Sequence, residues 1–147
     1  TQINSGNRGY HAITRYPRAD FASLNEPEAR LATHNRHDPI EHVAQNLADR
    51  LKAKHFAVTQ GTKGVMLLDS EGSQTYKVPA LSTKVLDRVG AGDSFLSFSA
   101  MCLGSGMDPE VAAFVGSSAA ALDVQIVCNR DPIAPVDLYK YITTLLK

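Results

Sequence analysis

The sequence predicts an α/β fold in which a layered sheet is flanked by helices. Short apolar segments at residues 21–24, 55–60 and 64–69 have the length and composition of buried strands. Amphipathic helical segments alternate with them, which is the pattern of an α/β layered domain. In such folds ligands bind at the carboxyl ends of the strands, so the loops after the apolar segments are where a site is expected.

The first elements follow from local signals. Residues 1–18 are polar and contain glycine, and they predict a loop with one short helical turn. The strand over residues 21–24 ends at Asn25. Pro27 then stands at a favourable first helical position, which predicts a short helix over residues 28–32.

The next helix has a start signal and one apolar face. Asp38, Pro39 and Glu41 match a cap, a first-turn proline and a capping-box glutamate. Apolar residues then recur every three or four positions, as in a helix that lies on a sheet. These residues are Ile40, Val43, Ala44, Leu47, Ala48 and Leu51.

Two further strands, over residues 64–69 and 74–78, are separated by a turn at residues 70–73 and predict an antiparallel hairpin. After Pro79 the chain crosses to a glycine-rich loop at residues 87–92. Helices are expected over residues 92–103, 109–122 and 136–146, the first ended by glycines and the second started by Asp108-Pro109. A short apolar segment, residues 124–128, precedes the last helix. In that helix the residues expected to face inward are Leu138, Tyr141, Ile142 and Leu145.

The glycine-rich loop carries the strongest chemical signal in the chain. Gly90, Ala91 and Gly92 have no side chain larger than a methyl group, so their backbone N–H groups are accessible. Asp93 follows directly at the start of a helix. Unpaired N–H groups at a helix N-terminus bind anions, and the bound anion is most often a phosphate group. A carboxylate beside a phosphate cradle repels the ligand, but it makes sense as a base for an attacking alcohol. The alternative is a loop that only starts a helix, with Asp93 complementing the helix dipole.

Residues 87–95 resemble the C-terminal signature of the ribokinase-like (PfkB) family of carbohydrate kinases, Asp-Thr-x-Gly-Ala-Gly-Asp followed by Ser or Thr and Phe. Two further stretches agree in order and spacing: residues 25–28 resemble the N-x-x-E motif and residues 59–64 the T-x-G-x-x-G loop. The residues around Asn25 look most like sugar-phosphate kinases related to heptose-phosphate kinase. The resemblance implies the C-terminal half of a ribokinase-like, Rossmann-like layered sheet, and transfer of the ATP γ-phosphoryl group to a sugar hydroxyl.

The resemblance also implies roles for single residues. Asp93 is the catalytic base, and Gly90, Ala91 and Gly92 form the anion hole for the transferring phosphoryl group. One departure from the family pattern is Arg88, which stands where the family usually has Thr. Because some members bind a monovalent cation partly through backbone near this point, Arg88 leaves cation use open.

The other two motifs are expected to serve the nucleotide and its metal. By resemblance Asn25 and Glu28 position Mg²⁺ and its waters; the alternative is a strand end followed by an ordinary first-turn acid. Thr59, Gly61 and Gly64 would line the triphosphate and ribose, although a plain turn between two strands also fits. The segment from residue 119 to Asn129 would border the adenine, and Asn129 is counted with the nucleotide-binding residues.

Composition limits the partners. Lys+Arg and Asp+Glu are equal at 15 each, so no basic field exists to hold nucleic acid or an anionic membrane. Cys102 and Cys128 are expected to be reduced thiols of a cytoplasmic protein, and no signal peptide or membrane-spanning run is evident. The histidines of residues 34–42 do not have a standard zinc spacing. The expected partners are ATP and a small sugar or sugar phosphate, with a homo-oligomer as a further option.

Length frames the functional alternatives. We expect residues 1–147 to be the C-terminal, nucleotide-binding and base-bearing portion of a ribokinase-like kinase domain, without the sugar-binding half that the resemblance implies upstream. One hypothesis is therefore an ATP-dependent carbohydrate kinase. The other is a catalytically silent nucleotide-binding or interaction module derived from such a kinase, in which an uncovered sheet edge favours self-association.

Overall fold

In the computed structural model the chain forms two compact units, and the predicted α/β class is confirmed. The first unit comprises Thr1–Gln60 and Met66–Tyr76, and the second comprises Gly61–Val65 and Lys77–Lys147. The structure describes residues 11–71, 73–82, 84–127 and 130–147.

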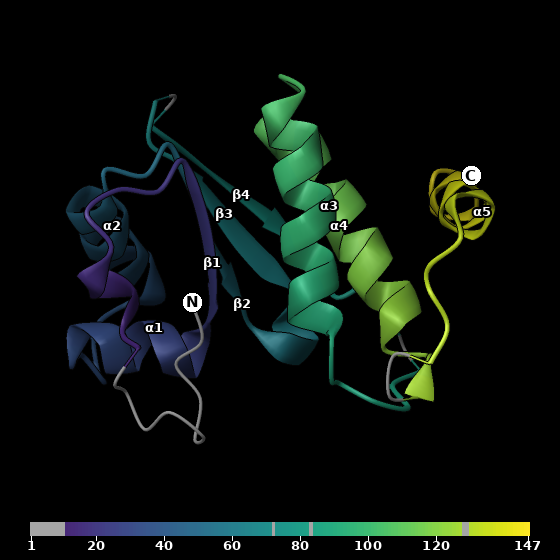
Figure 1. The fold of residues 1–147 in the computed structure, drawn as a ribbon, viewed down its shortest axis with the longest axis horizontal. Helices are drawn as coiled ribbons and strands as arrows, with labels where there is room; N and C mark the ends of the chain where they lie inside the picture. The colour runs from purple at the N-terminus through teal and green to yellow at the C-terminus, as the bar shows by residue number, and fades with distance from the viewer. Residues whose placement is uncertain (1–10, 72, 83, 128–129) are drawn as a thin grey trace. The chain divides into compact units, whose positions relative to one another are not determined.

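The first unit contains nearly all of the sheet (Figure 1). The four strands follow one another in the order β1-β2-β3-β4, and β1 pairs with β2 in parallel. Only residues 60–64 join β2 to β3, which is too short for a parallel crossover, so these two strands run antiparallel. The predicted neighbours β3 and β4 also lie side by side. The elements in chain order are the 3₁₀ turn η1 (Ile13–Arg15), β1 (Phe21–Asn25), α1 (Glu26–Thr33), α2 (Ile40–Leu51), β2 (His55–Thr59), β3 (Val65–Asp69) and β4 (Gln74–Val78).

The core of this unit is where α1 and α2 pack on the strands (Figure 1). The predicted apolar face of α2 is confirmed, because five of its six residues are buried and Ile40 packs against the same cluster. All five residues of β3 are buried, and β3 is an inner strand of the sheet. The largest buried side chains of the cluster are Phe56, Leu47, Leu51, Met66, Val43 and Val58.

The predicted cap of α2 is wrong. The cap position is Pro39 and no side chain caps the helix, although Pro39 keeps the extended ψ of 139° that such a position needs. Asp38 instead accepts a hydrogen bond from Asn35 Nδ2 at 2.8 Å, and its own N–H donates to Asn35 Oδ1 at 3.1 Å. The Asp38 side chain therefore bonds to Asn35 in the preceding turn instead of capping the first backbone N–H groups of α2.

The second unit is mainly helical. It contains η2 (Gly61–Lys63), α3 (Ala91–Gly104), α4 (Pro109–Asp123) and α5 (Pro135–Leu145). The helices α3 and α4 lie side by side (Figure 1), and their contact is made by small residues. Ser99 Oγ donates to the carbonyl of Ala112 at 3.1 Å, and a Cβ placed on Gly116 would lie 2.0 Å from that hydroxyl oxygen. The two helix backbones approach this closely because the residues between them are small.

The ends of these helices test the remaining predictions. Asp108 caps α4 as predicted, because its side chain accepts from the N–H of Glu110 at 2.8 Å. In α5, Leu138 is buried and the phenol of Tyr141 donates to the carbonyl of Leu81 at 2.6 Å, but Leu145 is 39% exposed and does not face inward. The turn η2 lies between β2 and β3, where the sequence analysis allowed a plain turn. Across the described residues, no helix combines the length and apolar character needed to span a bilayer.

Gly64 should be far less replaceable than Gly61, although both have positive φ. A Cβ on Gly64 would lie 2.0 Å from the carbonyl oxygen of Val78, whereas a Cβ on Gly61 meets nothing within 4 Å. We expect Gly61→Ala to lower the free energy of unfolding by about 1 kcal/mol and Gly64→Ala to lower it by about 2–4 kcal/mol. Urea unfolding of the two variants measures the difference; equal stabilities would contradict this close backbone approach.

Candidate functional site

Two of the predicted site residues are neighbours at the ends of parallel strands. Asn25 is the last residue of β1, Thr59 is the last residue of β2, and the two are paired in the register of the sheet. The preceding residues in the two strands, Leu24 and Val58, are also paired, and their burial in the core holds this register. The first unit therefore brings the N-x-x-E motif and the start of the T-x-G-x-x-G motif to the same edge of the sheet, as the sequence predicted.

Asn25 and Glu28 form a complete capping box at the start of α1. The Asn25 side chain accepts from the Glu28 N–H at 2.9 Å, and Glu28 Oε2 accepts from the Asn25 N–H at 3.2 Å. Each side chain thus satisfies a backbone donor that the helix leaves unpaired. One oxygen of the Glu28 carboxylate remains outside this box. The two residues have a structural role, and they present one carboxylate oxygen at the strand end.

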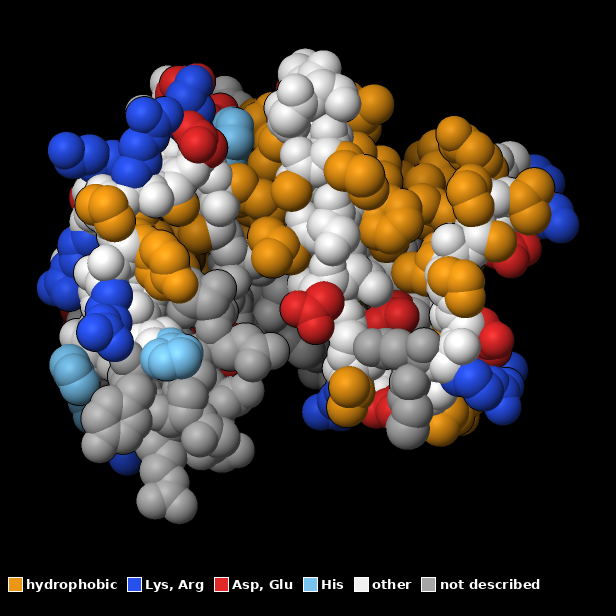
Figure 2. Space-filling view, in the orientation of Figure 1, with side chains coloured by type: hydrophobic (Ala, Val, Ile, Leu, Met, Phe, Trp, Pro, Cys, Tyr) orange, Lys and Arg blue, Asp and Glu red, His pale blue; other side chains and the backbone are white. Residues whose placement is uncertain are grey.

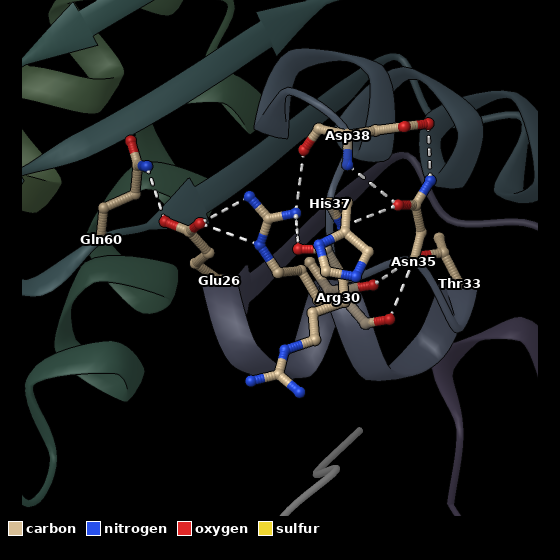
Figure 3. Close-up of polar contacts among 9 residues, drawn as sticks. Glu26, Arg30, Thr33, Asn35, His37, Asp38 and Gln60 are labelled. Carbon is tan, nitrogen blue, oxygen red and sulfur yellow. Dashed lines mark hydrogen bonds and ion pairs between the residues drawn. The ribbon is translucent and has the colours of Figure 1, made fainter.

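Glu26 connects the two strand ends, and no role was predicted for it (Figure 3). Its Oε2 accepts from Gln60 Nε2 at 2.9 Å, while its Oε1 accepts from Arg30 Nε at 3.0 Å and from Arg30 Nη2 at 2.8 Å. Gln60 is the second residue of the T-x-G-x-x-G motif. The half-buried Glu26 therefore ties that motif to the first turn of α1, with an ion pair that is less screened than a surface pair.

Arg30 extends the network into the loop before α2. Its Nη1 donates to the carbonyl of Arg36 at 3.3 Å and to that of Asp38 at 2.9 Å (Figure 3). One guanidinium group thus holds a carboxylate and two carbonyls, which its fork of donors allows. The polar, histidine-containing segment is a helix-to-helix turn built on Arg30 and Asn35, and among the described residues no three His, Cys, Asp or Glu side chains gather closely enough to hold a metal ion.

The rest of the T-x-G-x-x-G motif belongs to the second unit. Gly61–Lys63 form the turn η2, in which Lys63 is exposed, and the N–H of Gly64 donates to the Gly61 carbonyl at 3.0 Å. Both glycines have positive φ, at 58° and 93°. This backbone is a tight turn whose glycines are required by conformation, whatever ligand it receives.

The loop before α3 has the geometry of an anion cradle. Gly90 is the N-cap of α3 with φ 93° and ψ −24°, a conformation that favours glycine, and its carbonyl accepts from the Ser94 N–H at 2.8 Å. The N–H groups of Ala91, Gly92 and Asp93 lie in the first turn, where a helix supplies no acceptor. Asp93 is exposed. The second unit therefore places a carboxylate directly at a helix N-terminus that can bind an anion.

The same loop is fastened to the end of α4. The N–H groups of Leu86 and Asp87 both donate to the Val124 carbonyl, at 2.8 Å and 3.1 Å, and Asp87 Oδ1 accepts from the Val89 N–H at 3.0 Å. Arg88, the departure from the family pattern, is exposed. The loop conformation is thus fixed from both sides of Arg88 by bonds that do not use its side chain.

Asp123 is a further ionisable residue at this place, and the sequence analysis missed it. It is the last residue of α4, it is 5% exposed, and its Oδ2 has no hydrogen-bond partner among the described residues. Burial raises the pKa of the Asp123 carboxyl, a hydrogen bond from Ser94 lowers it, and the charges of Asp93 and Asp87 raise it. A visible signal was an acid at the negative, C-terminal end of a helix made mostly of apolar and small residues.

A cavity of about 510 Å³ lies in the second unit beside the end of α4. Three of its lining residues, Leu122, Gln125 and Ile126, belong to the segment that the resemblance places against an adenine. Asn129, the predicted contact in that segment, lies outside the described residues, as does Cys128. Across the opening, α5 contributes Asp137, Lys140, Tyr141 and Thr144. Cys102 is free and half-buried, and burial raises its pKa.

The chain is similar to several known proteins. Residues 9–132 match the family model described as pfkB family carbohydrate kinase. The Bifunctional protein HldE of Campylobacter fetus subsp. fetus is 33% identical over 121 residues, covering 80% of this chain and 26% of that protein. HldE of Koribacter versatilis is 30% identical over 90% of this chain and 27% of its own length. Adenosine kinase of Saccharomyces cerevisiae is 34% identical over 69% of this chain and 30% of its own length.

Solved structures share the fold. Phosphofructokinase-2 from Escherichia coli superposes with a TM-score of 0.77 at 22% identity, over 89% of this chain and 42% of that one. Ribokinase from Thermotoga maritima gives a TM-score of 0.73 at 26% identity, over 84% of this chain and 42% of that one. The chain thus spans about a quarter of the length of the HldE relatives and about two fifths of these structures.

The capping box predicts how Asn25 contributes to stability. Asn25→Ala removes the acceptor for the Glu28 N–H and should lower the free energy of unfolding by about 1 kcal/mol. Asn25→Ser keeps a side-chain acceptor at the N-cap and should change stability by only a few tenths of a kcal/mol. Thermal and urea unfolding of both variants tests this. An Ala variant as stable as the Ser variant would mean that the box contributes nothing.

Proposed function

Because the chain belongs to the pfkB family of carbohydrate kinases, we propose that it is the nucleotide-binding and base-bearing part of an ATP-dependent kinase acting on a sugar or sugar phosphate. The supporting observation is the start of α3. There a glycine with positive φ opens a helix N-terminus, and an exposed carboxylate follows three residues later. The first feature binds a phosphoryl group and the second accepts a proton.

The proposed reaction assigns one task to each group of that loop. Asp93 takes the proton of a sugar hydroxyl as the hydroxyl oxygen attacks the γ-phosphorus of ATP. The bond from that phosphorus to the bridging oxygen breaks, and ADP leaves with the electron pair. The N–H groups at Gly90, Ala91 and Gly92 stabilise the charge on the transferring phosphoryl oxygens, where preorganised donors act most strongly.

We assign magnesium to Asn25 and Glu28 through water. Both side chains cap α1, so the donor that fits a metal is the Glu28 oxygen outside the capping box. Mg²⁺ keeps several waters and is often held by one carboxylate with substrate phosphates, so this limited donor set fits it. When bound, Mg²⁺ neutralises phosphate charge. A monovalent cation is a third cofactor that some family members use, and Arg88 supplies a fixed positive charge on the loop concerned.

The nucleotide is assigned to the remaining motif. Thr59, Gly61 and Gly64 would face the triphosphate and ribose, and Asn129 with the cavity beside α4 would take the adenine. That cavity joins apolar lining to a few polar groups, which suits a planar heterocycle. For the acceptor we favour a heptose phosphate, since the residues around Asn25 resemble heptose-phosphate kinases and two similar proteins are both named HldE.

A second candidate function is an interaction module without activity. In the second unit several large apolar side chains are exposed on α3 and α5, among them Met101 at 59% and Tyr139 at 72%. Figure 2 shows apolar side chains gathered over these helices. Contiguous exposed apolar surface is typical of a protein-binding face. The two candidates differ in whether Asp93 is needed.

Asp93→Asn should abolish phosphoryl transfer and leave Mg-ATP binding intact or slightly tighter, because the amide cannot take the proton and no longer repels the phosphates. Gly90→Val should lose binding, since a β-branched residue does not adopt φ 93°. Calorimetric titration with Mg-ATP measures binding, and ADP release with a panel of sugars and sugar phosphates measures transfer. Full activity in Asp93→Asn would contradict the assignment of Asp93 as the base. The interaction module predicts no ADP release from the wild-type chain or from either variant.

Glu28→Gln separates the metal role from the helix cap. Gln also serves at the third position of a capping box, so stability should change little. Loss of the carboxylate charge should raise the Mg²⁺ concentration for half-maximal ATP binding by roughly tenfold. Calorimetry at a series of Mg²⁺ concentrations measures this. An unchanged Mg²⁺ dependence would leave Glu28 with the cap alone.

A further inference from the structure

The Glu26 carboxylate is shared between two partners from different parts of the first unit (Figure 3). On one side its Oε2 accepts from Gln60 Nε2 at 2.9 Å, across 34 positions of sequence. On the other side its Oε1 accepts from Nε and Nη2 of Arg30, at 3.0 Å and 2.8 Å. A carboxylate offers acceptors on both oxygens, whereas an amide in its place would turn an N–H donor toward one of these partners. Glu26 is therefore chemically suited to join two donor groups.

Arg30 makes Glu26 a fixed anchor. The Nη1 of Arg30 also donates to the carbonyls of Arg36 and Asp38, so the guanidinium is held by the turn before α2 as well as by Glu26. The side chains of Glu26 and Arg30 are 25% and 23% exposed, so salt screens their ion pair less than a surface pair. Gln60 is thus bonded to a group whose position is set by α1 and by the turn that follows it.

Gln60 stands where the sheet stops supporting the T-x-G-x-x-G motif. Thr59 is the last residue of β2 in register with β1, and Gly61 follows Gln60 with a φ of 58°. Glycine has more backbone freedom than any other residue, so the motif beyond Thr59 is costly to order. The bond from Gln60 to Glu26 extends the fixed part of the motif by one residue, up to that glycine. Ordering a loop before its ligand arrives improves affinity, because less entropy is lost on binding.

The charge of Glu26 is compensated as well as placed. Glu26 and Glu28 are both acids in the first turn of α1, and two uncompensated carboxylates would repel a triphosphate. Arg30 forms its ion pair with Glu26, while Glu28 bonds to the Asn25 N–H and keeps one oxygen outside the capping box. The network therefore neutralises the acid that holds Gln60 and leaves Glu28 as the charge available to a metal.

We propose that Glu26 is a positioning residue for the nucleotide: through Gln60 it holds the start of the T-x-G-x-x-G loop against the first turn of α1, and this sets the affinity for the ATP triphosphate. The inference rests on the proposed function, because it takes Thr59, Gly61 and Gly64 as the residues that line the nucleotide. An ordered loop favours the bound substrate and the transition state alike. The contribution of Glu26 therefore appears in ATP binding and not in the transfer step.

The first test removes the bond from Gln60 to Glu26 and leaves the Glu26–Arg30 ion pair in place. Gln60→Met does this, because methionine is similar in length to glutamine and has no amide. Gln45→Met is the matched control, since Gln45 Nε2 donates to the Asp49 carboxylate at 2.7 Å on an exposed part of α2. In calorimetric titration with Mg-ATP, Gln60→Met should bind roughly fivefold more weakly, the effect of one net hydrogen bond. Gln45→Met should bind as wild type does.

Thermal unfolding separates positioning from a merely structural bond. Each of the two Met variants loses one hydrogen bond from a side-chain amide to a carboxylate, so their melting temperatures should fall by similar, small amounts. Only Gln60→Met should also lose affinity for Mg-ATP. Wild-type affinity in Gln60→Met, whatever its melting temperature, would make the bond structural only and overturn the proposal.

A double-mutant cycle tests whether Gln60 acts through Glu26. In the Glu26→Ala background, Gln60→Met should have no further effect on Mg-ATP affinity, because the bond that it removes is already absent. This comparison holds whatever the loss of the Glu26 charge does to affinity by itself. Arg30 keeps the carbonyls of Arg36 and Asp38 as acceptors in Glu26→Ala. A fivefold loss that persists in the Glu26→Ala background would show that the two residues act independently, and it would overturn the proposal.

Steady-state kinetics gives the last readout. Gln60→Met should raise the KM for ATP by a similar factor and leave kcat unchanged. A lowered kcat with an unchanged KM would contradict the positioning role. Failure of the proposed function would appear differently, as a wild-type chain that binds Mg-ATP without releasing ADP, and calorimetry of Gln60→Met would still decide the role of Glu26. A wild-type chain that binds no Mg-ATP would overturn both proposals.

Discussion

The parallel pairing of β1 with β2 is the constraint on which the first unit's candidate site depends. Side chains alternate along a strand, so a slip of one residue would turn Leu24 outward and carry Asn25 toward the core. The register instead leaves Asn25 and Thr59 at adjoining strand ends. Glu26 then bonds to Gln60 and so joins the two strand ends. The geometry of the two short motifs is therefore held by the buried residues that precede them in the strands and by this hydrogen bond.

In the second unit a single backbone carbonyl, that of Val124, holds the loop of the candidate site in place. Val124 follows the last residue of α4, where carbonyls lack intrahelical partners, and it accepts from the N–H groups of Leu86 and Asp87. The unsatisfied end of α4 thereby orders the loop that precedes α3. The packing at Ser99 and Gly116 fixes α4 against α3, so a small-residue contact at mid-helix also determines what surrounds Asp93.

How much the sequence revealed depends on how local each signal is. The apolar period of α2 and the Asp108 cap of α4 were predictable, because each depends on residues within one or two turns. The Asp38 cap was wrongly predicted because Asn35, equally local, competes for the same side chain. Leu145 fits the apolar period of α5 and is nevertheless exposed. Periodicity predicts which face of a helix is apolar, but it does not predict how far along the helix other elements cover that face.

The contacts that matter most for the site were beyond sequence reasoning. Glu26 and Gln60 are 34 positions apart, and only the strand register makes them neighbours. Ser99 bonds to the Ala112 carbonyl because α3 and α4 pack, which no local pattern specifies. The glycine-rich loop was recognisable because its chemistry is contiguous: the glycines, the helix start and the carboxylate follow one another within residues 90–93.

The charge around that loop bears on the choice between the proposed kinase and a module that only binds a nucleotide. A module that only held a nucleotide would gain from neutral or basic neighbours, since each carboxylate near the cradle repels the phosphates. Here Asp93 stands at the cradle itself, and Asp87 and Asp123 carry charge nearby. A buried carboxylate with an unpaired oxygen further reduces the stability of the fold. Such an arrangement opposes both affinity and stability, and it supports the proposed assignment of Asp93 as a base.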